Sequence, residues 1–189
     1  DLHYQHFGQS SEHAPVVLIN HSLTGDANVA GPQGWWNEIV GPNLTIDTDY
    51  YSVLAFNIPG NGVKNYILDN YHDFHTGDIA EIFYHGLQIL GIQKLFALIG
   101  GSIGGGIAWE MAALYPHLSE NLIPVAADWK ASDWIIANTF LQNNRVPKSF
   151  NFETDSSLTF GVKLANGIIV ESTNATTLGN TNVSSDANI

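Results

Sequence analysis

The sequence predicts an α/β fold, a mostly parallel β-sheet with helices packed on its faces. Three apolar runs of strand length predict the sheet, and they cover residues 14–20, 51–57 and 95–99. Parallel strands are buried on both faces, so they read as continuous runs of branched and aliphatic residues rather than as alternating ones. Strands that alternate with helices form parallel sheets with right-handed crossovers.

The elements around these runs complete the expected sheet. A helix is predicted over 76–90, where apolar residues recur at helical spacing and Thr76 or Asp78 is available as a cap. A second helix is predicted over 107–115, and a proline ends it. Residues 122–127 form a weaker fourth strand candidate.

Composition favours one packed globular domain. Of the 189 residues, 44% are hydrophobic and only 13% are charged, which excludes a disordered polyelectrolyte. The formal net charge of -12 would repel nucleic acid and anionic membrane surfaces. The absence of cysteine excludes disulfides and thiolate metal sites. With neither a signal peptide nor an apolar run of about 20 residues, we expect a cytoplasmic chain outside the membrane.

The composition changes at about residue 148. Residues 1–147 carry the predicted sheet and helices, and we interpret them as the core. Residues 148–189 are rich in Asn, Ser, Thr and Gly. Within this tail we expect a hairpin over 158–171, because Ala165-Asn166-Gly167 suits a tight turn with positive φ. The rest of the tail has no periodicity and is expected to be disordered.

The segment Gly100-Gly101-Ser102-Ile103-Gly104-Gly105 joins a predicted strand to a predicted helix. It contains G-x-S-x-G, which places a serine nucleophile at the sharp strand-to-helix turn of an α/β-hydrolase-type sheet. Gly100 and Gly104 are expected where a β-carbon would collide with the neighbouring strand and helix. The alternative is a loop that cradles phosphate, but no lysine follows the last glycine as such a loop requires. Ser102 is therefore the predicted nucleophile.

The loop Asn20-His21-Ser22-Leu23-Thr24-Gly25 follows the first predicted strand. In the architecture that carries G-x-S-x-G, this loop supplies one backbone N–H to the oxyanion hole, and the residue after the nucleophile supplies the other. We therefore assign the two donors to Leu23 and Ile103. For His21, we expect a role in bracing the loop by hydrogen bonding rather than in direct catalysis.

Four ordered motifs make a resemblance specific. They are His21-Ser22-Leu23-Thr24-Gly25, Gly34-Trp35-Trp36, Ile46-Asp47-Thr48-Asp49 and the Gly100–Gly105 segment. Over roughly residues 3–146 the chain resembles the N-terminal portion of the homoserine O-acetyltransferase family, which has an α/β-hydrolase fold. The resemblance implies that Ser102 takes an acetyl group from acetyl-CoA and passes it to L-homoserine, in methionine biosynthesis. It implies homodimers for full-length relatives.

No metal and no bound cofactor are expected, since acetyl-CoA acts as a substrate. His72 and His75 form a close pair of histidines, without a carboxylate-rich site around them. The tryptophans Trp35 and Trp36 either wall the acyl site or pack under the loop, and we favour packing.

The sequence departs from the family after the elbow. In this fold the triad Asp and His follow the serine in the chain. The only later histidine, His117, lies at the far end of the next helix, about 20 Å away at 1.5 Å per residue. Asp128 is not followed by any histidine. We therefore expect that the triad Asp and His are not present, that the chain is truncated before the lid and the last strands, and that it is an inactive fragment.

Two other functions stay open. A serine esterase or another acyltransferase, such as a succinyltransferase, would use the same fold. A non-catalytic binding module that keeps the shell of a hydrolase is also compatible with an absent base and acid. Discharge of an acylated Ser102 by homoserine indicates the transferase, and discharge by water indicates the esterase. On gel filtration, a binding module should be a well-behaved species, whereas a truncated sheet should aggregate.

Overall fold

The computed structural model describes residues 2–63, 67–70, 73–130, 132–134 and 136–137, together with the backbone of 160–163 and 169–172. The chain divides into two compact units, Asp1–Trp129 and Lys130–Ile189. The predicted boundary after residue 147 lies outside the described residues. That boundary and the predicted disorder of the tail stay predictions.

The first unit is built on a five-stranded sheet with the strand order β1-β5-β2-β6-β7. In chain order its strands are β1 (Tyr4–Gly8), β2 (Val16–Asn20), β5 (Ser52–Phe56), β6 (Leu95–Gly101) and β7 (Ser119–Val125). The last four are parallel, and β1 pairs antiparallel with β5. The predicted fold class and the three strong strands are confirmed. Strand β1 was not predicted, because its residues are mostly exposed and carry no continuous apolar signal.

Two elements begin three or four residues earlier than predicted. Strand β7 begins at Ser119, before the predicted start at Leu122, because edge strands tolerate polar residues that the sheet does not bury. Helix α2 (Ile103–Leu114) begins directly after Ser102, before the predicted start at Ile107. Its glycines weaken the helical signal in sequence, but tertiary packing compensates for their low propensity.

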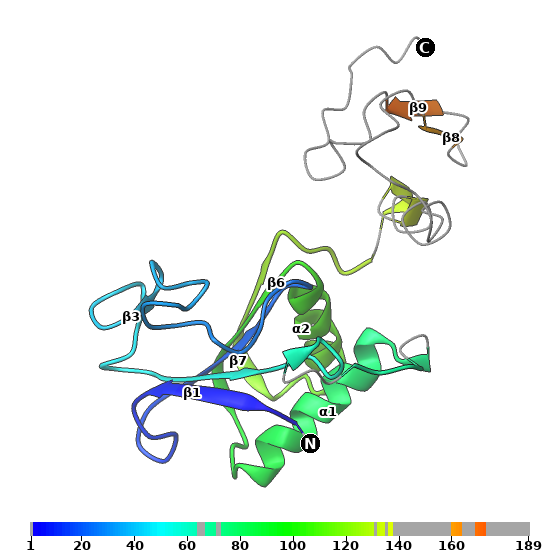
Figure 1. Ribbon diagram of the computed structural model, residues 1–189. Coiled ribbons are helices and arrows are strands. Elements are labelled where there is room, and N and C mark those ends of the chain that lie inside the picture. Colours follow the sequence, from blue (N-terminus) through cyan, green and yellow to red (C-terminus); the bar gives the residue numbers. More distant parts are fainter. Residues whose placement is uncertain are drawn as a thin grey trace. The chain divides into compact units, whose positions relative to one another are not determined.

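Helices α1 (Thr76–Ile89) and α2 cover one face of the sheet (Figure 1). The apolar core between them and the sheet includes Phe83 of α1, Met111 of α2 and Leu98 of β6, all fully buried. The cap of α1 differs from the prediction: the N-cap residue is His75, whose N–H donates to the Asp78 carboxylate at 2.7 Å. The helix ends before Gly91, whose φ of 73° closes the last turn.

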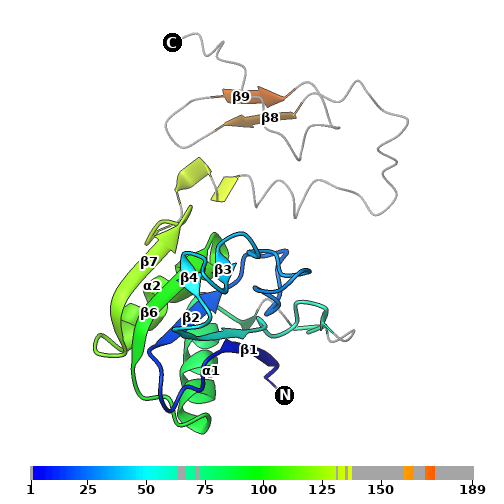
Figure 2. The same ribbon diagram turned by 90° about the vertical axis from the view of Figure 1, so that its left-hand side faces the viewer.

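The other face of the sheet is covered by the chain between β2 and β5 (Figures 1 and 2). This segment contains two short strands, β3 (Val40–Gly41) and β4 (Ile46–Asp47), which pair parallel. Its apolar side chains, such as Val29 and Val40, form a second buried cluster with the sheet. These buried side chains hold the segment against the sheet, and the loop that follows β2 is continuous with it.

The second unit contains one described strand pair, β8 (Phe160–Lys163) and β9 (Ile169–Ser172). They pair antiparallel, with Val162 opposite Val170. The pair lies where the sequence predicts a hairpin over 158–171, and the predicted turn lies outside the described residues. Among the described residues, none of the helices combines the length and apolar character that crossing a bilayer requires.

Candidate active site

Ser102 occupies a strained turn between β6 and α2. It has φ 53° and ψ -121°, a conformation that residues with a β-carbon rarely adopt. Its N–H donates to the carbonyl of Val125 at 2.9 Å, and its own carbonyl accepts the N–H of Gly105 at 2.9 Å. These bonds tie the turn to strand β7 on one side and to the first turn of α2 on the other. The side chain of Ser102 is exposed.

Three of the four predicted motif glycines are required by close backbone approach. A β-carbon on Gly100 would meet the carbonyl of Gly104 in α2. One on Gly104 would meet the carbonyls of Asn20 and His21 at the end of β2, and one on Gly105 would meet the side chain of Ala127. The collisions at Gly100 and Gly104, with the helix and the strand, are the ones that the sequence predicts, and the collision at Gly105 was not predicted. Gly101 differs, because a β-carbon there would meet nothing within 4 Å.

The loop that follows β2 leaves the sheet beside the turn at Ser102. Strands β2 and β6 are parallel neighbours with Asn20 opposite Gly100, so both end at the same edge of the sheet. Within the described residues, the backbone N–H groups of Leu23 and Ile103 take part in no hydrogen bond. Both amides are therefore unpaired on segments that emerge together, as donors to a developing oxyanion must be.

His21 is fully buried and joins this loop to the chain after β5. Its Nε2 accepts the N–H of Ile58 at 3.0 Å, so that nitrogen carries the lone pair. Its Nδ1 therefore carries the hydrogen, which it donates to the carbonyl of Ser22 at 2.6 Å. Burial lowers the pKa of His21 from its ordinary value of 6.5, while the bond to Ser22 and the charge of Asp26 act in the opposite direction. The ring is a neutral brace, in the role the sequence suggested.

Asn57 is a site residue that the sequence reasoning missed. It is buried at the end of β5, and its Oδ1 accepts the N–H of Ala27 at 2.7 Å. The available signal was that the first two apolar runs both end in asparagine, at Asn20 and Asn57. A buried amide directly after a buried strand must find hydrogen-bond partners in the adjacent loops.

The paired tryptophans support the same loop by packing. Trp35 and Trp36 are partly buried against the second apolar cluster, with ring centroids 4.8 Å apart. The indole N–H of Trp35 donates to the carbonyl of Asp26 at 2.9 Å. This arrangement agrees with the packing role that we favoured for them over an acyl-site wall.

No acid or base partner touches Ser102 within the described residues. Its hydroxyl makes no hydrogen bond there. His75, His85 and His117 are exposed, and none contacts the turn. Asp128 is also exposed. His72 lies outside the described residues, within which no group of three potential metal ligands is found.

Among the described residues, one serine hydroxyl does contact a histidine, at the opposite edge of the sheet. The Nε2 of His6 lies 2.8 Å from the hydroxyl of Ser52 and 2.9 Å from the carbonyl of Gln9. A carbonyl only accepts, so Nε2 carries the hydrogen and cannot take a proton from the serine. Ser52 is also fully buried in β5, which excludes it as a nucleophile.

A serine at a strained strand-to-helix turn, on the carboxyl edge of a parallel sheet, defines the α/β-hydrolase class. In agreement, the family model described as alpha/beta hydrolase fold matches residues 15–166, and the chain belongs to this family.

Within the family, its relatives include homoserine O-acetyltransferases. That of Corynebacterium jeikeium is 34% identical over 150 residues, which cover 74% of this chain and 36% of the relative. The crystal structure of the enzyme named homoserine O-acetyltransferase from Bacillus anthracis superposes with a TM-score of 0.65 at 29% identity, covering 76% of this chain and 45% of that one. Esterase E22 superposes with a TM-score of 0.60 at 26% identity, covering 74% and 45%. The chain therefore spans less than half the length of each.

Proposed function

We propose that Ser102 is the nucleophile of an acyl transfer that carries an acetyl group from acetyl-CoA to the hydroxyl of L-homoserine. The carrying observation is the backbone at residue 102, which holds an exposed serine in a strained turn at the sheet edge where the loop that carries Leu23 also leaves the sheet. The names of the relatives support the choice of reaction, since a homoserine O-acetyltransferase is 34% identical over 74% of this chain and another has the same fold with a TM-score of 0.65.

The reaction would run in two steps, acylation of Ser102 and transfer of the acetyl group to homoserine. The Ser102 oxygen attacks the thioester carbonyl, the C–S bond breaks, and the serine proton is transferred to the departing CoA sulfur, which leaves as the thiol. The hydroxyl of homoserine then attacks the acyl-serine and releases the acetyl ester and the free serine. In both steps the carbonyl oxygen becomes negatively charged, and the N–H groups of Leu23 and Ile103 would stabilise it.

The 189 residues supply no histidine after His117, so we expect them to acylate slowly and turn over little. When triad members are removed from a serine enzyme, the oxyanion hole and binding still give roughly 10³ to 10⁴-fold acceleration over water. Acetyl-CoA and L-homoserine as partners, the homodimer of full-length relatives and the cytoplasmic location belong to the same proposal.

The direct test is covalent labelling of Ser102. The chain is incubated with p-nitrophenyl acetate or acetyl-CoA, and the acetyl group is located by intact mass and peptide mapping. We expect single labelling at Ser102, absent in Ser102→Ala. Equal labelling of Ser102→Ala, or labels spread over other side chains, would overturn the proposal.

A serine esterase is the second candidate, because esterase E22 has the same fold over most of this chain. The two functions differ in what discharges the acetyl-serine. For the transferase we expect release to accelerate when L-homoserine is added and to yield its acetyl ester. A release rate that ignores L-homoserine would favour the esterase.

A further inference from the structure

One peptide group in the loop that follows β2 is held from its carbonyl side. The carbonyl oxygen of Ser22 accepts two hydrogen bonds, from Nδ1 of His21 at 2.6 Å and from the N–H of Gly25 at 3.0 Å. The N–H of Leu23 belongs to the same peptide group. Because a trans peptide is planar, its C=O and N–H point in opposite directions, and holding one aims the other.

From this geometry we propose that His21 is a positioning residue that aims the N–H of Leu23 at the acyl oxygen on Ser102. The inference rests on the proposed function and adds a residue to it. His21 touches neither substrate nor the reacting atoms and acts only through the Ser22–Leu23 peptide. The shorter of the two bonds to the Ser22 carbonyl comes from His21, so the ring contributes much of the hold.

The ring can act this way only as the Nδ1–H tautomer. The N–H of Ile58 donates to Nε2 at 3.0 Å, which keeps the hydrogen on Nδ1. The ring is fully buried, so it cannot rotate into solvent to exchange these partners. Through His21, the direction of the Leu23 amide is fixed by the chain just after β5. It does not depend on the loop alone.

The bond between Asn57 and Ala27 braces the loop without holding the Leu23 amide, so the two roles can be tested apart. Asn57 also ties the loop to the end of β5, but it accepts the N–H of Ala27 and does not contact the Ser22–Leu23 peptide. Loosening the loop at Asn57 therefore leaves the two bonds to the Ser22 carbonyl in place. Within the part of the chain that the structure describes, only His21 combines a bond to the chain just after β5 with a bond to that carbonyl.

Two substitutions split the functions of the ring. In His21→Asn the amide nitrogen replaces Nδ1 as donor to Ser22, and the bond to Ile58 is lost. In His21→Gln the longer side chain reaches Ile58 through its amide oxygen, and the bond to Ser22 is lost. We expect acylation of Ser102 by p-nitrophenyl acetate to stay within about threefold of the original rate in His21→Asn and to fall at least tenfold in His21→Gln, since losing an oxyanion donor outright costs about 10² to 10³-fold.

Leu95→Ala serves as the matched control for stability, because Leu95 is fully buried at the start of β6, at the opposite end of that strand from Ser102. It should lower the free energy of unfolding without changing the acylation rate. Equal losses of acylation in His21→Asn and His21→Gln, or rates that follow unfolding free energy in all three variants, would overturn the inference.

A measurement independent of chemistry separates this inference from the proposed function. Imidazole ¹⁵N spectra of the unsubstituted chain should show His21 as the neutral Nδ1–H tautomer. An Nε2–H tautomer, in a chain that still acylates at Ser102, would overturn the role of His21 alone. Absence of Ser102 acylation from the unsubstituted chain would overturn the proposed function and this inference with it.

Discussion

The two edges of the same parallel sheet each carry a serine, in opposite surroundings. Ser102 at the carboxyl edge is exposed, has a strained backbone and contacts no histidine among the described residues. Ser52 at the amino edge is buried in a regular strand and lies 2.8 Å from His6. A short Ser–His distance is therefore no marker of a nucleophile here. Backbone conformation and access to solvent favour Ser102, rather than Ser52, as the proposed nucleophile.

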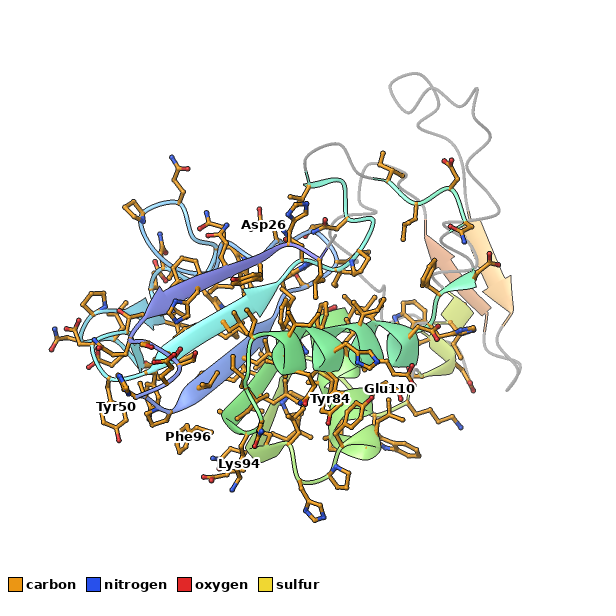
Figure 3. The ribbon with its side chains drawn as sticks, turned by 90° about the horizontal axis from the view of Figure 1, so that it is seen from below. Asp26, Tyr50, Tyr84, Lys94, Phe96 and Glu110 are labelled. Atoms are coloured by element: carbon orange, nitrogen blue, oxygen red, sulfur yellow. The ribbon has the colours of Figure 1, made fainter. Side chains whose placement is uncertain are left out.

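The amino edge is instead built for packing. Tyr51 stacks on Phe96 with ring centroids 5.3 Å apart, and Tyr50 meets Tyr51 edge to face at 4.8 Å. Figure 3 shows Tyr50 and Phe96 at this end, away from Asp26 in the loop that follows β2. Aromatic contacts fill this edge, whereas the carboxyl edge keeps exposed backbone donors. The difference agrees with the rule that ligands bind at the carboxyl ends of parallel strands.

The largest expected effect tests the comparison directly. Ser102→Ala should abolish specific acetyl labelling, whereas Ser52→Ala should leave the labelling rate unchanged and cost about 1 kcal/mol of stability for one hydrogen bond. Intact mass after incubation with p-nitrophenyl acetate measures the first, and urea unfolding measures the second. Loss of labelling in a folded Ser52→Ala chain would contradict our assignment of the edges.

The next effect concerns the glycines at the carboxyl edge. Gly104→Ala would drive a β-carbon into the carbonyls of Asn20 and His21, and we expect it to cost about 3 kcal/mol of unfolding free energy. Gly106→Ala in the same helix meets nothing within 4 Å and should stabilise by up to about 1 kcal/mol. Urea titrations of both variants provide the measurement, and equal stabilities would show that the strand end does not constrain the turn.

A smaller effect measures the backbone strain at Ser102. Ser102→Gly should raise the free energy of unfolding by about 1 kcal/mol relative to Ser102→Ala, because glycine adopts φ 53° without steric cost. Both variants lack the hydroxyl, so the comparison isolates the backbone. If the alanine variant were as stable as the glycine variant, the turn would store no strain.

The smallest effect is a dependence of stability on pH through His21. Its folded pKa lies below the ordinary value of 6.5, so the unfolded chain binds the proton more readily. This contribution to stability is fully present above pH 6.5 and is lost as pH falls toward the folded pKa, with a slope of at most about 1.4 kcal/mol per pH unit. Urea unfolding of the original chain and of His21→Asn from pH 7.5 downward should diverge below 6.5. Parallel curves would show that His21 titrates normally.

The apolar runs predicted the buried strands because a strand covered on both faces must be apolar throughout. Val16 to Asn20 and Ser52 to Phe56 are both buried at every position. The same argument failed for β1 and the first part of β7, at the two edges of the sheet, where exposed positions tolerate polar residues. The predicted roles of Ser102, Leu23 and Ile103 stay predictions, although the turn and the unpaired amides agree with them.

What the sequence determined by itself was local: buried strands, the glycines at the turn, and the serine between strand and helix. Such features depend on residues close together in the chain, where side-chain type restricts backbone conformation directly. Tertiary structure alone decided that His21 bonds to Ile58, that Asn57 bonds to Ala27, and that Ser52 rather than Ser102 lies beside a histidine. These contacts join segments about 30 to 46 residues apart in the chain, and only the register of neighbouring strands brings their ends to the same edge.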